Sequence, residues 1–222
     1  MTEPLPWYPV LLDLRGRNCL VVGGGQVGAR KAAGLLDCGA TVTMVSISVN
    51  ADARSLVGRS GFELVERAYR TSDLRGVWLV VTAIDDSATT ARVHDDAETA
   101  RVWMNAADDP KNCSVILPAT HRDGDVLIAV STGGASPAAA GWLRDRIAVE
   151  LGDLPGRLVD GVKDVRDRVR IFRSSEGLPW RSLVDALATA DADAHSLTSA
   201  WLTDNCLPSA CGSCGARCGA LE

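Results

Sequence analysis

The sequence predicts an α/β protein, with a Rossmann-like parallel sheet followed by a small β segment and a helical C-terminal domain. Short apolar runs alternate with helical patterns between residues 18 and 105, which is typical of a doubly wound parallel sheet. A glycine-rich turn joins the first run to the first helical pattern. Beyond residue 113 the pattern changes to two short apolar runs and then to helical periodicity alone.

The glycine-rich turn follows a four-residue apolar run at residues 19–22, which predicts a buried strand. Gly23, Gly25 and Gly28 have the spacing G-x-G-x-x-G. The first glycine allows a tight turn, the second lets a pyrophosphate approach the backbone, and the third lets the next helix pack closely. A helix beginning at Gln26 would direct free N–H groups at the phosphates. The alternative is a tight turn that binds no ligand.

The rest of the parallel sheet is predicted from further apolar runs. These strands are expected at residues 40–47, 62–65, 77–83 and 101–105. Helices are expected at residues 52–57 and 87–100, besides the one from Gln26 to the glycine at position 39. Val10, Leu12 and Leu14 alternate in a way that predicts an edge strand ahead of the glycine-rich turn.

The second half of the chain predicts a hairpin and then helices only. Residues 114–117 and 125–131 are expected to be the hairpin strands, joined by a polar turn at 121–124. Ser136 and Pro137 are suited to the N-cap and first position of a helix that runs to about residue 151. Further helices are expected at residues 156–172, 180–190 and 195–203.

Composition restricts the class of protein. The chain has 222 residues, of which 46% are hydrophobic and 23% charged, as in soluble globular proteins. It contains no apolar run of transmembrane length and no leader pattern, so we expect a cytoplasmic protein with no membrane partner. The net charge of −5 argues against nucleic acid as a partner.

The end of the second predicted strand bears on the choice of dinucleotide. NAD-binding folds usually carry a carboxylate there, which binds the ribose hydroxyls. This chain has residues 44–48, Met-Val-Ser-Ile-Ser, and its next carboxylate is Asp52. Either the serines and the backbone hold the ribose, or Asp52 reaches back to it. The nearest arginine is Arg54, and NAD is favoured over NADP.

A second polar motif, residues 105–111, follows the fifth strand with the sequence Asn-Ala-Ala-Asp-Asp-Pro-Lys. Ligands bind at the carboxyl edge of open α/β sheets, so Asp108 and Asp109 could act there as a general acid or base. Adjacent side chains of an extended segment point in opposite directions, so one of the two should face the site. The alternative is a polar turn that only ends the strand.

Three motifs together carry a resemblance to a known family. They are Gly-Gly-Gly-x-Val-x-x-Arg-Lys, Asn-x-x-Asp-x-Pro-Lys and Ser-x-Gly-Gly-x-Ser-Pro. The chain resembles precorrin-2 dehydrogenase/sirohydrochlorin ferrochelatase, the N-terminal module of siroheme synthase, from about residue 5 to residue 151. The absence of an acid after the second strand also matches the family. The helical region to about residue 203 is similar in type only.

This resemblance implies an NAD-dependent oxidation of precorrin-2 to sirohydrochlorin in siroheme biosynthesis, followed in some members by insertion of Fe²⁺. It implies a homodimer, formed through the segment after the Rossmann domain. The family's essential aspartate corresponds to Asp108. Its NAD-contacting positions, beside the glycines, correspond to Gln26, Val27, Ile47 and Ser48.

We therefore expect four parts in the chain. They are an NAD-binding domain at 1–113, a dimerisation and substrate segment at 114–150, a helical domain at 151–205 and a Cys-rich tail at 206–222. A tetrapyrrole with eight carboxylates needs cations and hydroxyl donors. Candidates are Lys111, Arg122, Arg144 and Arg146, with the hydroxyls of Ser131, Thr132 and Ser136. Each of them could instead be a solvated residue or a helix cap.

The chain has seven cysteines, which fall into two groups. Cys19, Cys38 and Cys113 have apolar surroundings in the sequence and are expected to be reduced core thiols. The tail contains the other four, Cys206, Cys211, Cys214 and Cys218. Their short spacing could hold zinc or an iron–sulfur cluster, or the tail could be unstructured and reduced.

Two other functions compete with the dehydrogenase. The chain could be a non-catalytic Rossmann protein that responds to NAD and, through the Cys tail, to metal. Asp108 in its motif argues against that reading. The chain could also be a chelatase that has lost the use of NAD, but the complete set of three glycines argues against this one.

Overall fold

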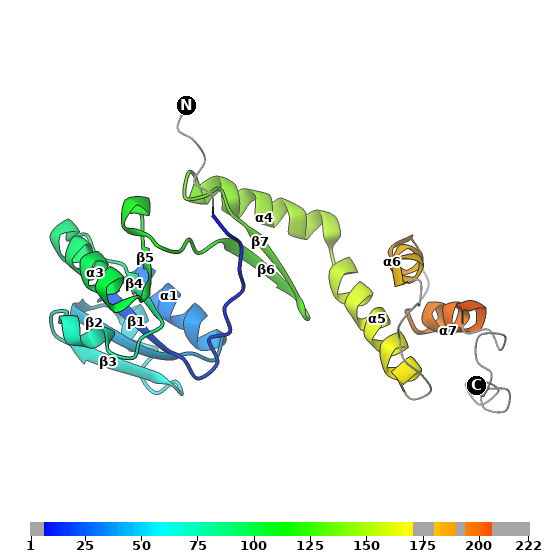
Figure 1. The fold of residues 1–222 in the computed structure, drawn as a ribbon, viewed down its shortest axis with the longest axis horizontal. Coiled ribbons are helices and arrows are strands. Elements are labelled where there is room, and N and C mark those ends of the chain that lie inside the picture. Colours follow the sequence, from blue (N-terminus) through cyan, green and yellow to red (C-terminus); the bar gives the residue numbers. More distant parts are fainter. Residues whose placement is uncertain (1–6, 171–179, 190–193, 206–222) are drawn as a thin grey trace. The chain divides into compact units, whose positions relative to one another are not determined.

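The computed structural model describes residues 7–170, 180–189 and 194–205, and it divides into two compact units (Figure 1). The first unit comprises the chain up to residue 118 together with residues 131–137. The second comprises residues 119–130 and the chain from residue 138 onward.

The first unit is built on a five-stranded parallel sheet, which confirms the predicted Rossmann-like fold. The strand order is β3-β2-β1-β4-β5, so β1 is central and the chain winds outward from it in both directions. A ligand crevice is expected at such a switch point, outside the carboxyl ends of the strands. The strands are β1 (Asn18–Gly24), β2 (Thr41–Val49), β3 (Phe62–Glu66), β4 (Leu79–Thr82) and β5 (Trp103–Ala106).

Helices cover both faces of this sheet because alternate strand residues point to opposite faces. Val21 packs in a cluster with α1 (Gln26–Asp37) and α2 (Ala51–Arg54), whereas Leu20 packs in a cluster with α3 (Ser87–Ala100). Asp86 caps α3, because its carboxylate accepts from the backbone N–H groups of the first turn. Two short 3₁₀ helices, η1 (Thr71–Leu74) and η2 (Pro110–Asn112), complete the unit.

The predicted edge strand through Val10, Leu12 and Leu14 is wrong. This segment is extended but belongs to neither sheet, and only Leu14 is buried in the core. The backbone N–H of Gly16 donates to the carbonyl of Gly39 at 2.8 Å, which ties the segment to the loop after α1.

The first strand of the hairpin begins later in the chain than predicted. Residues 114–117 are not a strand; Val115 and Leu117 pack against the sheet core. The N–H groups of Ser114 and Val115 both donate to the carbonyl of Met104, at 2.9 and 3.0 Å. The segment therefore covers the outer edge of β5, and that edge pairing competes with hairpin formation. The hairpin consists of β6 (Ala119–Asp123) and β7 (Val126–Val130), which are antiparallel.

The second unit joins this hairpin to helices. They are α4 (Pro137–Leu151), α5 (Leu154–Arg170), α6 (Trp180–Thr189) and α7 (Ala194–Asn205). Val165, Leu183 and Leu187 form the centre of a core between α5, α6 and α7, where Trp180 stacks on Trp201. The predicted end of α5 at residue 172 lies outside the described residues.

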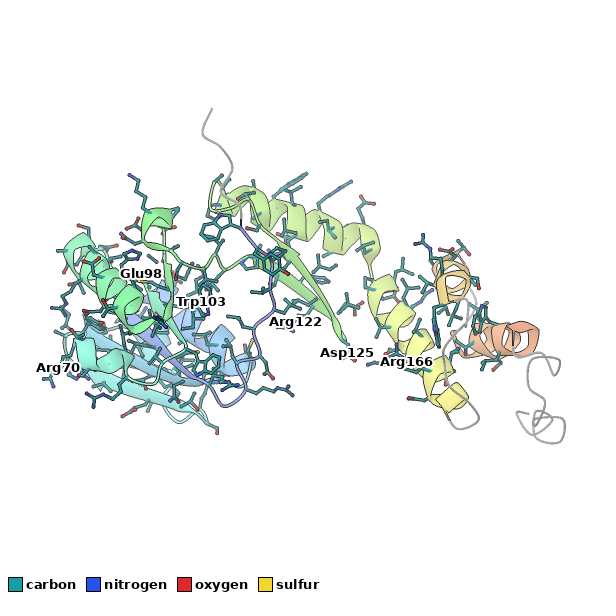
Figure 2. All side chains as sticks on the ribbon, in the orientation of Figure 1. Arg70, Glu98, Trp103, Arg122, Asp125 and Arg166 are labelled. Atoms are coloured by element: carbon teal, nitrogen blue, oxygen red, sulfur yellow. The ribbon has the colours of Figure 1, made fainter. Side chains whose placement is uncertain are left out.

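Two contacts fasten the hairpin to α5. The carboxylate of Asp123 accepts from the backbone N–H of Gly156 at 2.7 Å, so a negative charge lies at the positive end of the helix. Asp125, at the hairpin tip in Figure 2, forms an ion pair with Lys163.

Candidate active site

The turn after β1 can be made only by glycine at two positions. Gly23 has φ +121°, and a Cβ there would lie 2.2 Å from the carbonyl oxygen of Ala83. A Cβ at Gly28 would lie 2.1 Å from the carbonyl oxygen of Gly23. The turn is thus pressed against the residue that follows β4, at the switch point of the sheet. These contacts are the ones expected of the first and third glycines of the motif.

Gly25, in contrast, lies in open space, because a Cβ added there would meet no atom within 4 Å. It is the N-cap of α1, it has no side chain to cap the helix, and the first turn of α1 carries no acidic residue. The first N–H groups of α1 therefore face an open space that an anion can enter. The residues fit a dinucleotide pyrophosphate at this point.

The end of β2 lies beside this open space. Gly24 pairs with Val49, and the backbone N–H of Asn50 donates to the carbonyl of Gly24 at 2.9 Å. Ile47 and Ser48 are exposed on this rim, Ile47 by 81%. Gln26 and Val27 are exposed at the start of α1. The four positions that the family resemblance indicates are thus accessible and surround the glycine turn.

The carboxylate of Asp52 contacts the side chain of Asn50, two residues earlier in the chain. The side chain of Asn50 caps α2 by accepting from Ala53 N–H at 2.9 Å, and its Nδ2 lies 3.4 Å from a carboxylate oxygen of Asp52. Ser46 donates its hydroxyl to the carbonyl of Ser48 at 2.7 Å. Both Asp52 and the serines thus have contacts within their own segment, at the end of β2 and the start of α2.

Asp108 follows β5 at the same edge of the sheet. It has φ +59°, a left-handed conformation that is rare outside glycine, asparagine and aspartate, and its side chain is exposed. Ala107 N–H donates to the carbonyl of Thr82 at 2.9 Å, which anchors the turn to β4. Asp109 differs, because its carboxylate accepts from the side chain of Asn112 at 2.6 Å. Of the two residues, Asp108 is the more exposed.

Two neighbours of Asp108 were not predicted as site residues. Cys113, expected to be a core thiol, lies within the Asp108 turn, and burial raises its pKa. Lys31, on α1, is half-buried; burial lowers the pKa of its ammonium group, whereas the charge of Asp108 raises it. Lys31 is therefore within electrostatic reach of Asp108. Its signal in the sequence is a lysine at the border of the buried face of α1.

The loop at residues 131–137 lies against the Asp108 motif. A Cβ on Gly134 would lie 3.4 Å from Pro110, and one on Gly133 would lie 3.3 Å from the indole ring of Trp7. The structure therefore brings together the second and third motifs, which are more than 20 residues apart in the chain. Lys111, in η2, is exposed beside this loop.

The hydroxyls of this loop have internal partners. Thr132 Oγ1 accepts from the backbone N–H of Ser136 at 2.9 Å, and Ser131 Oγ accepts from Gly133 N–H at 3.1 Å. Thr132 Oγ1 also donates its proton to the carbonyl oxygen of Ser136 at 3.1 Å, so these bonds shape the loop and use the proton of the Thr132 hydroxyl.

The candidate arginines belong to the second unit. Arg144 forms an ion pair with Asp145 at 2.6 Å, and Arg146 forms one with Glu150 at 2.7 Å. Arg122 lies on β6 (Figure 2). The charges of Arg144 and Arg146 are thus already compensated within α4.

The predicted metal ligands Cys206, Cys211, Cys214 and Cys218 lie outside the described residues. Within the described ranges, His, Cys, Asp and Glu side chains form no group of three that could hold a metal ion. Among the helices in those same ranges, none combines the length and the apolar character needed to cross a bilayer.

Two family descriptions match this chain. Residues 10–119 match a family described as NAD(P)-binding, and residues 123–150 match the central part of sirohaem biosynthesis proteins. The siroheme synthase of Methylococcus capsulatus is 39% identical over 166 residues, which is 75% of this chain and 35% of that protein. The siroheme synthase of Citrobacter koseri is 34% identical over 197 residues, or 85% of this chain and 43% of that protein. The chain thus spans less than half the length of these relatives.

A solved structure has the same fold. It is that of SirC, a precorrin-2 dehydrogenase, with a TM-score of 0.68 and 22% sequence identity. The superposition covers 89% of this chain and 98% of that one. The parallel sheet, the antiparallel hairpin and the helices that follow are therefore shared with that protein.

Proposed function

Because this chain belongs to the precorrin-2 dehydrogenase/sirohydrochlorin ferrochelatase family, the N-terminal module of siroheme synthase, we propose that it oxidises precorrin-2 to sirohydrochlorin with NAD⁺. The observation that carries this proposal is the carboxyl edge of the sheet. There the open space at Gly25 and the exposed carboxylate of Asp108 follow two strands that both flank β4.

The glycine turn is proposed to bind the dinucleotide. Gly23 and Gly28 set the shape of the turn, and the N–H groups that begin at Gly25 bind the pyrophosphate. Gln26 and Val27 border one side of the ligand, and Ile47 and Ser48 border the adenosine side. Bound NAD⁺ supplies the hydride acceptor.

Asp108 is proposed to be the proton acceptor. Oxidation of the tetrapyrrole releases a proton as well as a hydride, so a base must lie beside the substrate. Asp108 is exposed, and its backbone has the left-handed conformation at φ +59°. Lys31 supplies a nearby positive charge.

The loop at residues 131–137 and η2 are proposed to bind the substrate carboxylates. Lys111 offers an ammonium group, and Ser131, Thr132 and Ser136 offer hydroxyls, on segments that contact each other through Gly134 and Pro110. The backbone of the half-buried Gly133 and Gly134 carries no side chain and can also approach a carboxylate closely.

Fe²⁺ is proposed as a second substrate. Metal insertion requires the pyrrole nitrogens to lose two protons, and the Asp108 carboxylate is available to receive them. The four tail cysteines are proposed to hold zinc or an iron–sulfur cluster apart from this chemistry, since the catalytic motifs end near residue 137.

A homodimer in the cytoplasm is also proposed. Its support is an exposed apolar surface on α4, formed by Trp142, Leu143 and Val149. Light scattering should give twice the mass of one chain, and Trp142→Glu should reduce it toward the mass of a single chain.

Anaerobic incubation with precorrin-2 tests the activity. We expect NADH and the absorbance of sirohydrochlorin to appear only when NAD⁺ is present, and a further change to follow added Fe²⁺. Binding of NAD⁺ without oxidation would favour the non-catalytic NAD-responsive alternative. Insertion of metal without any use of NAD⁺ would favour a chelatase alone.

A further inference from the structure

An ion pair lies at the carboxyl ends of β2 and β3. Arg54, the last residue of α2, donates from both Nη groups to the two carboxylate oxygens of Glu66, each at 2.9 Å. Glu66 is the last residue of β3 and pairs in register with Ser46 of β2. The pair therefore lies at the end of β2, on the same edge of the sheet as the glycine turn.

The ion pair also lies on the face of the sheet that carries α1. Phe62 and Leu64 pack against the core cluster that contains α1 and α2, and Glu66 continues this alternation two residues later. The start of α2 is held to the glycine turn by the bond from Asn50 N–H to the carbonyl of Gly24. Arg54 follows four residues after Asn50.

The residues around the ribose 2′ position determine whether such a fold binds NAD or NADP. In dinucleotide-binding folds, a carboxylate at the end of the second strand binds the ribose 2′-hydroxyl of NAD, whereas a nearby arginine accommodates the 2′-phosphate of NADP. Arg54 is the first arginine after β2, and each of its two Nη groups already donates a hydrogen bond to Glu66. The next arginine along the sheet edge, Arg67, is held in the same bidentate way by Asp73, at 2.7 and 2.8 Å.

We propose that Glu66 excludes NADP from this site, both by occupying Arg54 and by placing a negative charge beside the position of a 2′-phosphate. The inference depends on the proposed binding of NAD⁺ at the glycine turn. Hydrogen bonds from Arg54 lower the pKa of the Glu66 carboxyl, so this negative charge is present throughout the neutral pH range. Selection against the wrong ligand by a repulsive charge is a common source of specificity.

Direct binding measurements with NAD⁺ and NADP⁺ as probes test the proposal without any enzymatic assay. Isothermal titration of the full chain should show wild type binding NAD⁺ more tightly than NADP⁺. Glu66→Gln and Glu66→Ala should each tighten NADP⁺ binding by roughly tenfold, the value of one hydrogen bond to a charged group, and leave NAD⁺ binding within about twofold. Adding Arg54→Gln to either variant should remove the part of the gain that the released Arg54 supplies and leave the part that comes from the lost negative charge.

Asp37→Asn is the matched control. It removes the carboxylate from another exposed ion pair, in which Arg59 Nη2 lies 2.8 Å from Asp37, at the opposite edge of the sheet. Its affinities for both dinucleotides should equal those of wild type. Unchanged NADP⁺ binding in both folded Glu66 variants would overturn the inference, as would equal affinity of wild type for the two dinucleotides. Wild type that binds neither dinucleotide would contradict the proposed function itself.

Discussion

The thiol of Cys113 lies against the backbone of Ala106, the last residue of β5. Its Sγ accepts from the Ala106 N–H at 3.2 Å and lies 3.3 Å from the Ala106 carbonyl oxygen. It also lies 3.4 Å from the carbonyl oxygen of Asp109. The edge of β5 and the far side of the Asp108 turn are thus joined through one sulfur atom.

This relationship predicts the effect of replacing Cys113. Cys113→Val leaves the Ala106 N–H without a partner, which should lower the free energy of unfolding by about 1–3 kcal/mol. Cys113→Ser keeps a side chain that can both donate and accept a hydrogen bond, so its free energy of unfolding should fall by less. Chemical denaturation measures both, and a valine variant as stable as wild type would show that the sulfur contacts contribute nothing.

The raised pKa of Cys113 adds a prediction about pH. The thiol should stay protonated at neutral pH, so its alkylation, followed by peptide mass spectrometry, should be slow and should still accelerate above the ordinary thiol pKa. Since the folded state holds this proton more tightly, the corresponding stability is present below the unfolded pKa and is lost as the pH rises through the folded pKa. A rate that levels off at the ordinary thiol pKa would contradict the burial of Cys113.

Gly25→Asp should abolish NAD⁺ binding. A Cβ at this position meets no protein atom within 4 Å, so the fold should tolerate the substitution, but the new charge would occupy the space proposed for the pyrophosphate. Gly34→Asp is the control, because Gly34 lies later in α1 and is equally open. If the Gly25 variant bound NAD⁺ like wild type in a titration, the turn would be structural only.

Asp108→Asn should bind NAD⁺ normally and oxidise precorrin-2 about 10²–10⁴-fold more slowly, because it lacks a proton acceptor. Asparagine is the suitable replacement, since it tolerates the left-handed backbone at φ +59°. Asp109→Asn should retain most of the activity. Comparable rates for Asp108→Asn and wild type would remove Asp108 from the mechanism.

Gly23→Ala and Gly28→Ala should destabilise the first unit. Each added Cβ would lie within 2.2 Å of a backbone oxygen, so we expect a loss of about 3 kcal/mol or more in the free energy of unfolding. Gly34→Ala, in open space on the same helix, should instead stabilise by about 0.5–1 kcal/mol. Thermal melts distinguish the two directions.

Truncation after Asn205, the last residue of α7, should preserve NAD-dependent oxidation. If the tail thiolates hold a metal or a cluster, anaerobically purified full-length protein should contain zinc or iron that the truncated form lacks. The metal content should fall at low pH, as the ligands become protonated. Elemental analysis with no metal above background would leave the tail reduced and metal-free, whereas loss of oxidation would place part of the active site in the tail.

The sequence by itself determined the parallel sheet and the glycine turn, because both depend on local rules. A short β-branched run such as Val21 and Val22 forms a buried strand, and the glycine spacing is that of a tight turn between a strand and a closely packed helix. Gly23 and Gly28 have the close contacts expected from that spacing. The family motif likewise indicated Asp108 over Asp109.

Only the tertiary structure decided what depends on pairing between distant segments. The apolar run at 114–117 resembles a hairpin strand, yet it covers the edge of β5. It does so because backbone groups of Met104 and Ala106 at that edge need hydrogen-bond partners, which residues 113–115 supply. For the same reason Cys113 lies in the Asp108 turn, Lys31 lies within reach of Asp108, and Arg54 is bound by a glutamate 12 residues away. The periodicity of apolar residues indicates which face of a helix or strand a residue occupies. It does not identify the residue of another segment that contacts it.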